Sequence, residues 1–399
     1  MSLNSTPSGE RVHIGFFGRR NAGKSSLVNA FTNQNLSIVS DVKGTTTDPV
    51  FKAMELLPLG PVMIVDTPGL DDEGELGNLR IKKCMEIVRK VDIAILVVDL
   101  GEGLSDEDLQ IRSMLKERDI PTVLVMNKSD RYPDFKRING EEIDIPAKNI
   151  LYVSATSGVG INELRERVAE LKPDPEKERD LLPPEIREGS TIILVIPIDS
   201  SAPKGRIILP QQQVLRDALD RGVTAVCCRE TELAATIDSL KKLPDLVITD
   251  SQAFALVNEV VAGRCPLTSF SILMAKYKGD YEWQLKGAQA LDSIEDGDLI
   301  LIAEGCTHHR QCEDIGAVKL PKWIGEYTGK TPVYEFCSGI EFADEDVLQK
   351  YKLVIPCGAC MLNEREVRYR VELCKEKNVP ITNYGMAIAK LKGILDIVT

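Results

Sequence analysis

A glycine-containing loop near the start of the chain has the residue types that bind phosphate. It runs from Gly18 to Ser25 with the sequence GRRNAGKS, after the apolar run Val12–Phe17 and before a segment with helical spacing. Its glycines let backbone N–H groups turn inward toward an anion, and the start of the following helix adds a partial positive charge. Lys24 adds a full positive charge, and Ser25 supplies a hydroxyl for Mg²⁺. Strand, loop and helix together are typical of a P-loop, although a glycine-rich turn of another βα unit has a similar pattern.

Two further segments supply the residues that a phosphate–Mg²⁺ site needs. Thr46 lies in the threonine-rich segment 43–49 and is a candidate ligand of the metal and the γ-phosphate, although an ordinary polar loop would look the same. Asp66 ends the apolar run 61–65, where an aspartate can hold Mg²⁺ through water. Gly69, three residues later, has an N–H group that can approach the γ-phosphate.

The segment Asn127–Asp130 indicates which base is bound. It follows the apolar run 121–126 and reads NKSD. The Asp130 carboxylate can accept hydrogen bonds from the ring N–H and the amino group of guanine, a pair that adenine lacks. Asn127 would connect loops, and the stem of Lys128 could cover the base. After the run 150–153, the backbone at Ser154 and Ala155 could meet the guanine oxygen.

These motifs each follow a strand of a βα series, and a parallel sheet binds ligands at the carboxyl ends of its strands. Residues 10–172 therefore resemble the small GTPases, within them the Era- and MnmE-like group. The resemblance implies GTP or GDP with Mg²⁺ held by Ser25, Thr46 and Asp66, and hydrolysis that involves Lys24, Thr46, Asp66 and Gly69. The predicted nucleotide contacts are Gly18, Asn21, Ala22, Gly23, Lys24, Ser25, Ser26, Asn127, Lys128, Asp130, Ser154 and Ala155.

Two residues predict the rate and the ion dependence of hydrolysis. Leu70 stands where Ras-like proteins carry a glutamine that orients water, and an apolar side chain cannot do so. Asn21 resembles the asparagine that helps MnmE-like proteins bind K⁺ beside the phosphates, where the ion stabilises developing charge. We therefore expect slow hydrolysis that potassium stimulates.

Composition limits the other function classes. The chain has 399 residues and a net charge of −12, which argues against a nucleic-acid partner because such partners need a basic face. It has neither a secretory signal nor an apolar run long enough for a membrane span, so we expect a cytoplasmic protein with reduced thiols. Of its ten cysteines, four are predicted to be buried thiols of structural type: Cys84, Cys227, Cys228 and Cys374.

The chain is predicted to be α/β throughout, with three domains. A P-loop GTPase domain with a doubly wound, mostly parallel sheet covers residues 1–172, and a charged, proline-bearing linker covers 173–190. Residues 191–264 alternate three strands with helices. So small a parallel sheet would leave strand edges unpaired, and pairing across a twofold axis would cover them, so we expect a homodimer. Residues 265–399 form the third domain.

The third domain carries three cysteines in positions that could hold metal. Cys306 follows the apolar run 298–303, and Cys357 and Cys360 follow the run 352–356, so the two groups can meet at one edge of a sheet. Asn363 is a candidate N-cap of a helix that would direct N–H donors toward an anionic cluster. Three thiolates suit zinc as well as an iron–sulfur cluster, and a chance CxxC turn remains an alternative. Cys312 and Cys337 stay ambiguous.

The order GTPase, small α/β domain, C-x-H and then C-x-x-C resembles HydF, the GTPase maturation factors of FeFe-hydrogenase. The resemblance implies a dimer that binds a 4Fe–4S cluster through Cys306, Cys357 and Cys360 and leaves an exchangeable fourth site. His308 or an oxygen of Glu304 are candidates for that site. The family often has histidine directly before its C-x-x-C, where this chain has Pro356.

The resemblance also implies a function. Such a protein would scaffold the di-iron precursor of the H-cluster, receive it from radical-SAM hydrogenase maturases and deliver it to apo FeFe-hydrogenase. One alternative is an Era-like GTPase with a structural zinc domain that acts in ribosome or RNA maturation, which the acidic charge disfavours. Another is a tRNA-modifying GTPase like MnmE, in which the GTPase is inserted into another domain.

Overall fold

The structure is a computed structural model that describes residues 8–33, 50–67, 84–135, 143–171, 180–198, 207–305, 314–339, 342–343, 345–359 and 362–398. The chain divides into two compact units, 1–178 and 179–399, and each is described by itself. In the described ranges no helix is both long and apolar enough to cross a membrane.

A six-stranded sheet forms the centre of the first unit, with the strand order β2-β3-β1-β4-β5-β6. All neighbouring strands are parallel except β2 and β3, which run antiparallel. The strands are β1 (Val12–Phe17), β2 (Val50–Leu56), β3 (Gly60–Asp66), β4 (Ile93–Asp99), β5 (Thr122–Asn127) and β6 (Ile150–Tyr152). Every residue of β4 is buried, as its continuous apolar sequence predicts. The doubly wound, mostly parallel P-loop fold is thereby confirmed.

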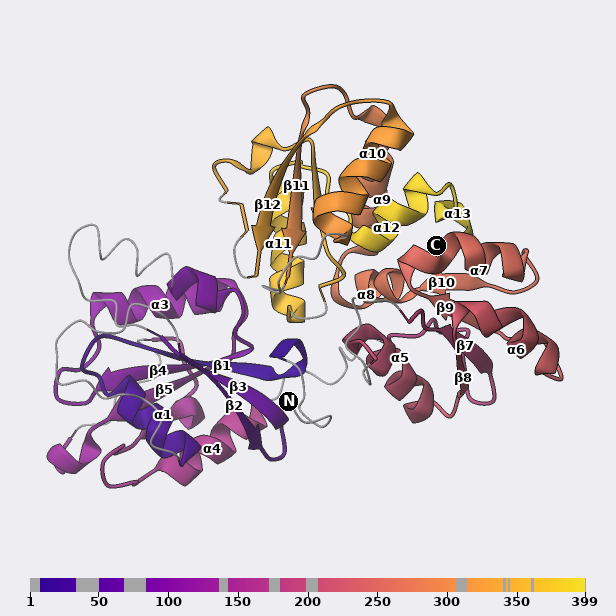
Figure 1. The fold of residues 1–399 in the computed structure, drawn as a ribbon. Helices are drawn as coiled ribbons and strands as arrows, with labels where there is room; N and C mark the ends of the chain where they lie inside the picture. Colours follow the sequence, from indigo (N-terminus) through magenta and orange to yellow (C-terminus); the bar gives the residue numbers. More distant parts are fainter. Residues whose placement is uncertain are drawn as a thin grey trace. The chain divides into compact units, whose positions relative to one another are not determined.

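Helices cover both faces of this sheet (Figure 1). α1 (Lys24–Thr32) and α4 (Ile161–Glu170) pack on one face, where Leu27, Phe31 and Leu164 are buried. α3 (Asp106–Glu117) packs on the other face through Ile111 and Leu115. This helix begins with a capping box between Ser105 and Asp108, which satisfies N–H groups of its first turn.

The second unit contains two parallel sheets. The first has the order β10-β9-β7-β8, from β7 (Thr191–Val195), β8 (Thr224–Cys228), β9 (Leu246–Thr249) and β10 (Leu267–Ser269). The sequence predicted only three strands here and placed 267–269 in the next domain, but β10 pairs with β9 in register Leu267–Val247. One face of this sheet is covered by α5 (Leu209–Asp220) and α8 (Phe270–Lys278). The other face is covered by α6 (Leu233–Ser239) and α7 (Phe254–Val261).

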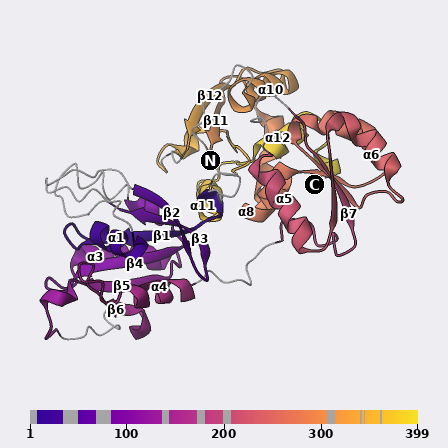
Figure 2. The same ribbon diagram turned by 60° about the horizontal axis from the view of Figure 1, so that its bottom comes forward.

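The second sheet of this unit has the order β12-β11-β13. Its strands are β11 (Leu299–Glu304), β12 (Val333–Ser338) and β13 (Leu353–Pro356). α10 (Leu320–Thr328) and α12 (Tyr384–Leu391) pack on one face and α11 (Glu364–Glu376) on the other. α9 (Tyr281–Gln289) and α13 (Leu395–Val398) complete the described helices of the unit, which Figure 2 shows from a second direction.

Two local expectations differ from the structure. Residues 181–186, which the sequence analysis placed in the linker, contribute Leu181, Leu182 and Ile186 to the core around α5. Cys227 was predicted to be buried but is exposed, and Cys228 is half-buried, because β8 is an edge strand. Cys84 and Cys374 are buried as predicted, and burial raises the pKa of each thiol to about 12.

Candidate functional site: the P-loop and the ends of two parallel sheets

The P-loop connects β1 to α1 and is built on positive φ angles. Gly18, Asn21 and Gly23 have φ of 137°, 61° and 92°. A Cβ on Gly18 would lie 2.1 Å from the carbonyl oxygen of Val97, and one on Gly23 would lie 2.3 Å from Nδ2 of Asn127. Glycine is therefore required at both positions, and the resulting curl directs backbone N–H groups inward at the N-terminus of α1.

Lys24 lies within this loop. Its Nζ donates to the carbonyl oxygens of Gly18 (2.8 Å) and Arg19 (2.7 Å), and the residue is buried. The ammonium group is thereby held in the space that the loop encloses, where it can compensate phosphate charge. The phosphate contacts predicted for Lys24 and the loop glycines stay predictions.

Ser25 and Asp66, both predicted to hold Mg²⁺, meet directly. Ser25 Oγ donates to Asp66 Oδ2 at 2.7 Å, across 41 residues of sequence. The other carboxylate oxygen of Asp66 is buried and has no hydrogen-bond partner among the described residues. Burial raises the pKa of this carboxyl group, while the Ser25 hydrogen bond and the Lys24 charge oppose the rise. Hard oxygen donors of this kind suit Mg²⁺, so these residues fit the metal.

Asn127 connects the P-loop to the loop after β6. Its Nδ2 donates to the carbonyl oxygen of Ala22 at 2.9 Å, and its Oδ1 accepts from the N–H of Ala155 at 3.1 Å. The side chain is 1% exposed. Ser154 is fully buried next to this junction, and its Oγ accepts from the N–H of Ser157. The predicted connecting role of Asn127 is therefore visible in the structure.

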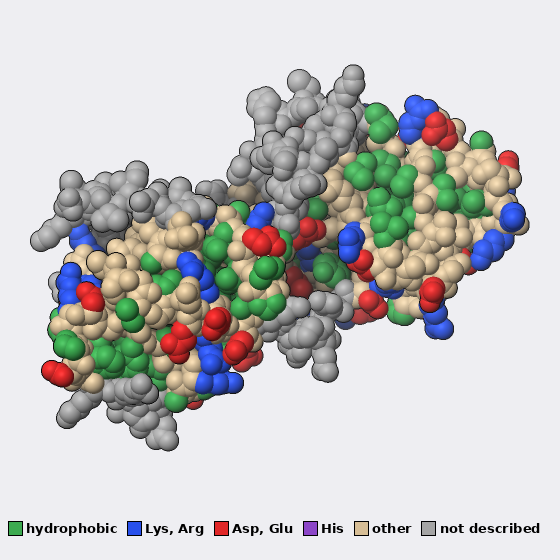
Figure 3. Space-filling model, turned by 90° about the horizontal axis from the view of Figure 1, so that it is seen from below, with side chains coloured by type: hydrophobic (Ala, Val, Ile, Leu, Met, Phe, Trp, Pro, Cys, Tyr) green, Lys and Arg blue, Asp and Glu red, His purple; other side chains and the backbone are tan. Residues whose placement is uncertain are grey.

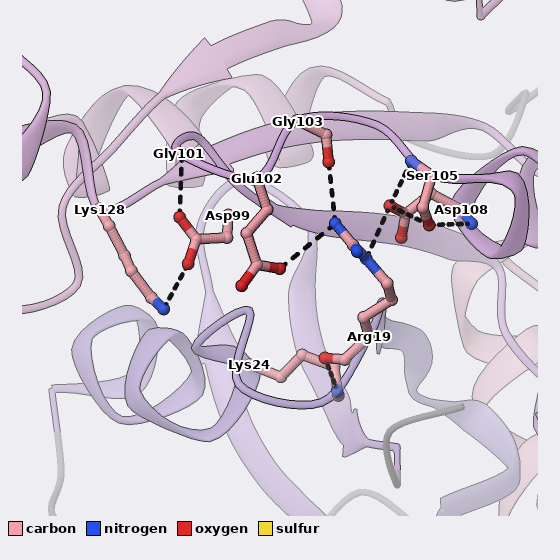
Figure 4. Close-up of polar contacts among 9 residues, drawn as sticks. All are labelled: Arg19, Lys24, Asp99, Gly101, Glu102, Gly103, Ser105, Asp108 and Lys128. Carbon is pink, nitrogen blue, oxygen red and sulfur yellow. Dashed lines mark hydrogen bonds and ion pairs between the residues drawn. The ribbon is translucent and has the colours of Figure 1, made fainter. Parts of the chain in front are cut away.

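Lys128 makes an ion pair that the sequence did not predict. Its Nζ lies 2.6 Å from Asp99 Oδ2, and Oδ1 of Asp99 accepts from the N–H of Gly101 (Figure 4). Asp99 ends β4, and its place at the carboxyl end of a buried strand was the signal that could have identified it. Asp130 is exposed in the short 3₁₀ turn after Lys128, where a base can reach it.

Arg19, the second residue of the P-loop, is also held by distant residues. Its Nη2 donates to the carbonyl oxygen of Gly103 at 2.9 Å, and its guanidinium approaches Asp108 (3.4 Å) and Glu102 (3.5 Å), as Figure 4 shows. Asp108 is fully buried, and burial raises the pKa of its carboxyl group against the opposing hydrogen bonds of Ser105 and the charge of Arg19. These contacts fix the P-loop to the start of α3.

In the second unit, the predicted cysteine groups follow two adjacent parallel strands. Cys357 comes directly after β13 and Gly305 directly after β11. The N–H of Cys357 donates to the carbonyl oxygen of Ala303 at 2.9 Å, and the N–H of Gly305 donates to Cys357 Sγ at 3.1 Å. The half-buried Cys357 thiol thus lies beside the residue that precedes Cys306 in the sequence. Asn363 is the N-cap of α11, as predicted.

Several predicted residues lie outside the described residues: Thr46, Gly69, Leu70, Cys306, His308, Cys312 and Cys360. Within the described ranges, no group of three or more His, Cys, Asp or Glu residues could hold a metal ion. Cys357, whose sulfur faces a backbone N–H donor, fits a thiolate ligand, since such donors stabilise cluster sulfur atoms.

The visible surface carries charges of both signs. On the face drawn in Figure 3, Lys and Arg side chains are interspersed with Asp and Glu. Hydrophobic side chains gather on part of the second unit in this view.

Three family models match the chain. The Hydrogen maturase F dimerization domain matches residues 181–279 and the Hydrogen maturase F tetramerization domain matches residues 282–398. A 50S ribosome-binding GTPase model matches residues 13–128. Together they match most of each unit.

Curated relatives match the GTPase part. The tRNA modification GTPase MnmE of Endomicrobium trichonymphae is 35% identical over 189 residues, 45% of this chain and 40% of that protein. GTPase Der of Chlamydia caviae is 32% identical over 179 residues, 44% of this chain and 37% of that protein. The chain thus spans well under half the length of either relative.

Solved structures of GTPases also match parts of the chain. Era of Aquifex aeolicus has a TM-score of 0.35 and 19% identity, and the match covers 63% of this chain and 97% of Era. A probable GTP-binding protein engB has a TM-score of 0.33 and 24% identity, over 40% of this chain and 98% of that protein. Because both TM-scores are low, the family assignment rests on the family models.

Proposed function

Because the chain belongs to the hydrogen maturase F family, we propose that it is a GTP-hydrolysing scaffold that carries the di-iron precursor of the H-cluster and delivers it to apo FeFe-hydrogenase. The family membership supports the coarser statement that it is a GTPase of hydrogenase maturation. The carried precursor, the radical-SAM maturases that supply it and the receiving hydrogenase are part of the proposal.

The GTPase part is supported by the geometry of its own residues. Lys24 and the N–H groups of the P-loop bind and neutralise phosphate, and Asp130 selects guanine. Ser25 and Asp66 would hold Mg²⁺, which neutralises charge on the β- and γ-phosphates when bound. Thr46 and Gly69 remain candidates for the γ-phosphate contacts. The nucleotide would act as a switch on partner association, because γ-phosphate contacts order loops that hydrolysis releases.

The cluster part rests on one observation: Cys357 and Gly305 meet at the carboxyl ends of β13 and β11. Cys306, Cys357 and Cys360 would hold a 4Fe–4S cluster, with His308 or Glu304 as candidates for the fourth position. Such a cluster supplies an iron with an exchangeable coordination site. Glu304 is buried and accepts from the Tyr384 hydroxyl at 3.3 Å, so a neighbouring hydrogen bond orients its carboxylate.

Metal content tests this proposal. The full chain, purified without oxygen, should be brown and contain about four iron and four sulfide per chain. Cys357→Ala should lose the iron and keep GTP hydrolysis, whereas Cys227→Ala, which removes an exposed thiol on β8, should keep both. A colourless protein with stoichiometric zinc would overturn the proposal and favour the Era-like alternative.

We further propose that potassium stimulates a slow hydrolysis through Asn21. This residue is exposed on the P-loop with a φ of 61°, so its side chain is accessible to an ion beside the phosphates. GTP hydrolysis should be faster in potassium than in sodium chloride at equal ionic strength. Asn21→Ala should remove this difference while nucleotide binding remains. Equal rates of GTP hydrolysis by the wild-type protein in both salts would contradict the proposed potassium stimulation.

The family's dimerization and tetramerization domains support self-association. We propose a homodimer in which the open edge of β8 contributes, since β8 ends its sheet and has half-exposed residues. Light scattering at micromolar concentration should give at least twice the 44.1 kDa of one chain. A monomer would contradict this assembly.

A further inference from the structure

A small, partly open cavity lies beside the loop that carries Cys357. It has a volume of about 30 Å³ and is lined by residues of α8, α9 and α11 and by the segment 356–359. A cavity of this size holds a ligand of about two or three heavy atoms. Four polar side chains from different parts of the second unit line it: Lys278, Gln284, Arg370 and Asn383.

Two buried cationic side chains line the cavity. Lys278 and Arg370 are 3% and 2% exposed, and among the described residues that line the cavity there is no Asp or Glu. Arg370 forms an ion pair with Glu366, which lies one turn earlier on α11 and is 3% exposed. Cationic side chains in a buried lining attract an anion more strongly than they would in water, because the local dielectric constant is lower.

Lys278 connects the cavity to the cysteine loop. Its Nζ donates to the carbonyl oxygens of Ala359 (3.3 Å) and Leu362 (3.0 Å), which precede and follow residues 360–361 in the chain. A change in the cavity would therefore be transmitted to the backbone next to Cys357.

One nitrogen of the Arg370 guanidinium has no hydrogen-bond partner among the described residues. Its Nε donates to Glu366 Oε1 at 2.8 Å and its Nη2 to the carbonyl oxygen of Gly339 at 3.2 Å, which fixes the guanidinium plane. Its Nη1 is buried and has no hydrogen-bond partner in the part of the chain that the structure describes. A buried charged donor without a partner is costly, so such a group calls for a ligand.

We propose that this cavity binds a small monoanion of two or three heavy atoms through Arg370 Nη1 and the charge of Lys278. The bound anion holds the backbone of 357–359 in place. This site is separate from the P-loop and does not depend on a bound cluster.

Azide, a linear three-atom monoanion, is a suitable probe. The metal-free full chain, with GDP and Mg²⁺ filling the P-loop, is titrated with azide while the antisymmetric stretch is followed by infrared spectroscopy. We expect a band distinct from free azide that saturates, is displaced by formate, and is accompanied by slower alkylation of Cys357. A spectrum containing only free azide up to the highest concentration would overturn the proposal.

A matched pair of variants assigns the site. E366Q/R370Q replaces both buried charged side chains with neutral glutamine. It should weaken azide binding at least tenfold. E364Q/R368Q removes the corresponding i,i+4 pair on the more exposed side of α11 and should leave binding unchanged. Circular dichroism checks that both variants fold. A band that persists in E366Q/R370Q would refute this location, and if that variant does not fold, the wild-type titration and the alkylation rates still decide.

Discussion

Asn127→Ala tests whether nucleotide affinity depends on a connection between two loops. Asn127 donates to Ala22 in the P-loop and accepts from Ala155 after β6, and it is almost fully buried. The alanine variant removes both hydrogen bonds and adds no bulk. We expect both loops to lose their common support, although neither contains the substitution.

The magnitude follows from the two groups that lose a partner. The Ala22 carbonyl would stay unsatisfied in a buried site and the Ala155 N–H in a partly buried one. An unsatisfied buried group costs about 1–3 kcal/mol. The total is about 2–6 kcal/mol if the nucleotide complex requires both loops in their present positions. At about 1.4 kcal/mol for each factor of ten, the dissociation constant for GDP should rise by at least about 30-fold.

The assay is a titration with a fluorescent guanine nucleotide, well below the unfolding temperature of the variant. Asn149→Ala is the matched control, because Asn149 is also buried and its Nδ2 donates to the carbonyl oxygen of Thr122 at the opposite end of β5. This control should lower the free energy of unfolding and leave nucleotide affinity nearly unchanged. If Asn127→Ala loses no more affinity than Asn149→Ala, the connecting role is wrong.

Three further predictions concern the first unit. Burial lowers the pKa of His13, so the folded protein binds a proton at this residue more weakly than the unfolded chain does. The free energy of unfolding should therefore fall as the pH drops from about 6.5. In thermal unfolding scans, His13→Asn should show a smaller decrease of the unfolding temperature over this pH range. Gly18→Ala would place a Cβ against the Val97 carbonyl and should abolish nucleotide binding, whereas Gly60→Ala, at a positive φ with open space, should only lower the unfolding temperature; similar affinities in both would contradict the steric argument. Asp130→Asn should weaken guanine nucleotide binding by about 10⁴-fold and favour xanthine nucleotides, and unchanged guanine preference would remove Asp130 from base recognition.

The strands of the first unit could be predicted closely from sequence because parallel strands buried on both faces are continuous apolar runs. β1 has the bounds of the apolar run Val12–Phe17 from which it was predicted. β2 was not predicted, because it is an antiparallel edge strand in which Val50 and Phe51 are exposed and its pattern is weak. β10 was not predicted as a strand, and its residues were placed in the third domain, since only three residues form it and pairing with β9 has no local signal.

In the candidate sites, too, the sequence predicted residues that belong to local motifs and missed contacts between distant residues. Motif spacing singled out Lys24, Asp66 and Asn127. Lys24 begins α1, and Asp66 and Asn127 are the last residues of β3 and β5 at the carboxyl edge of the sheet. Motif spacing did not identify the partners of Arg19, which lie more than 80 residues away at α3. Nor could it identify Arg370, because an arginine at that position of α11 looks like a solvated residue until packing buries it.

The cysteine site is expected to exist before any metal binds. Cys357 is positioned by backbone pairing: β13 lies beside β11, the Cys357 N–H binds the Ala303 carbonyl, and the Gly305 N–H reaches the sulfur. Small zinc domains, in contrast, fold only when the metal joins their ligands. The second unit has apolar cores on both faces of both sheets, so it does not need metal to fold. Chelation should therefore remove the iron while the far-ultraviolet circular dichroism and the unfolding temperature of this unit change little. Unfolding on chelation would show that the metal, and not the pairing of β11 with β13, determines where Cys357 lies.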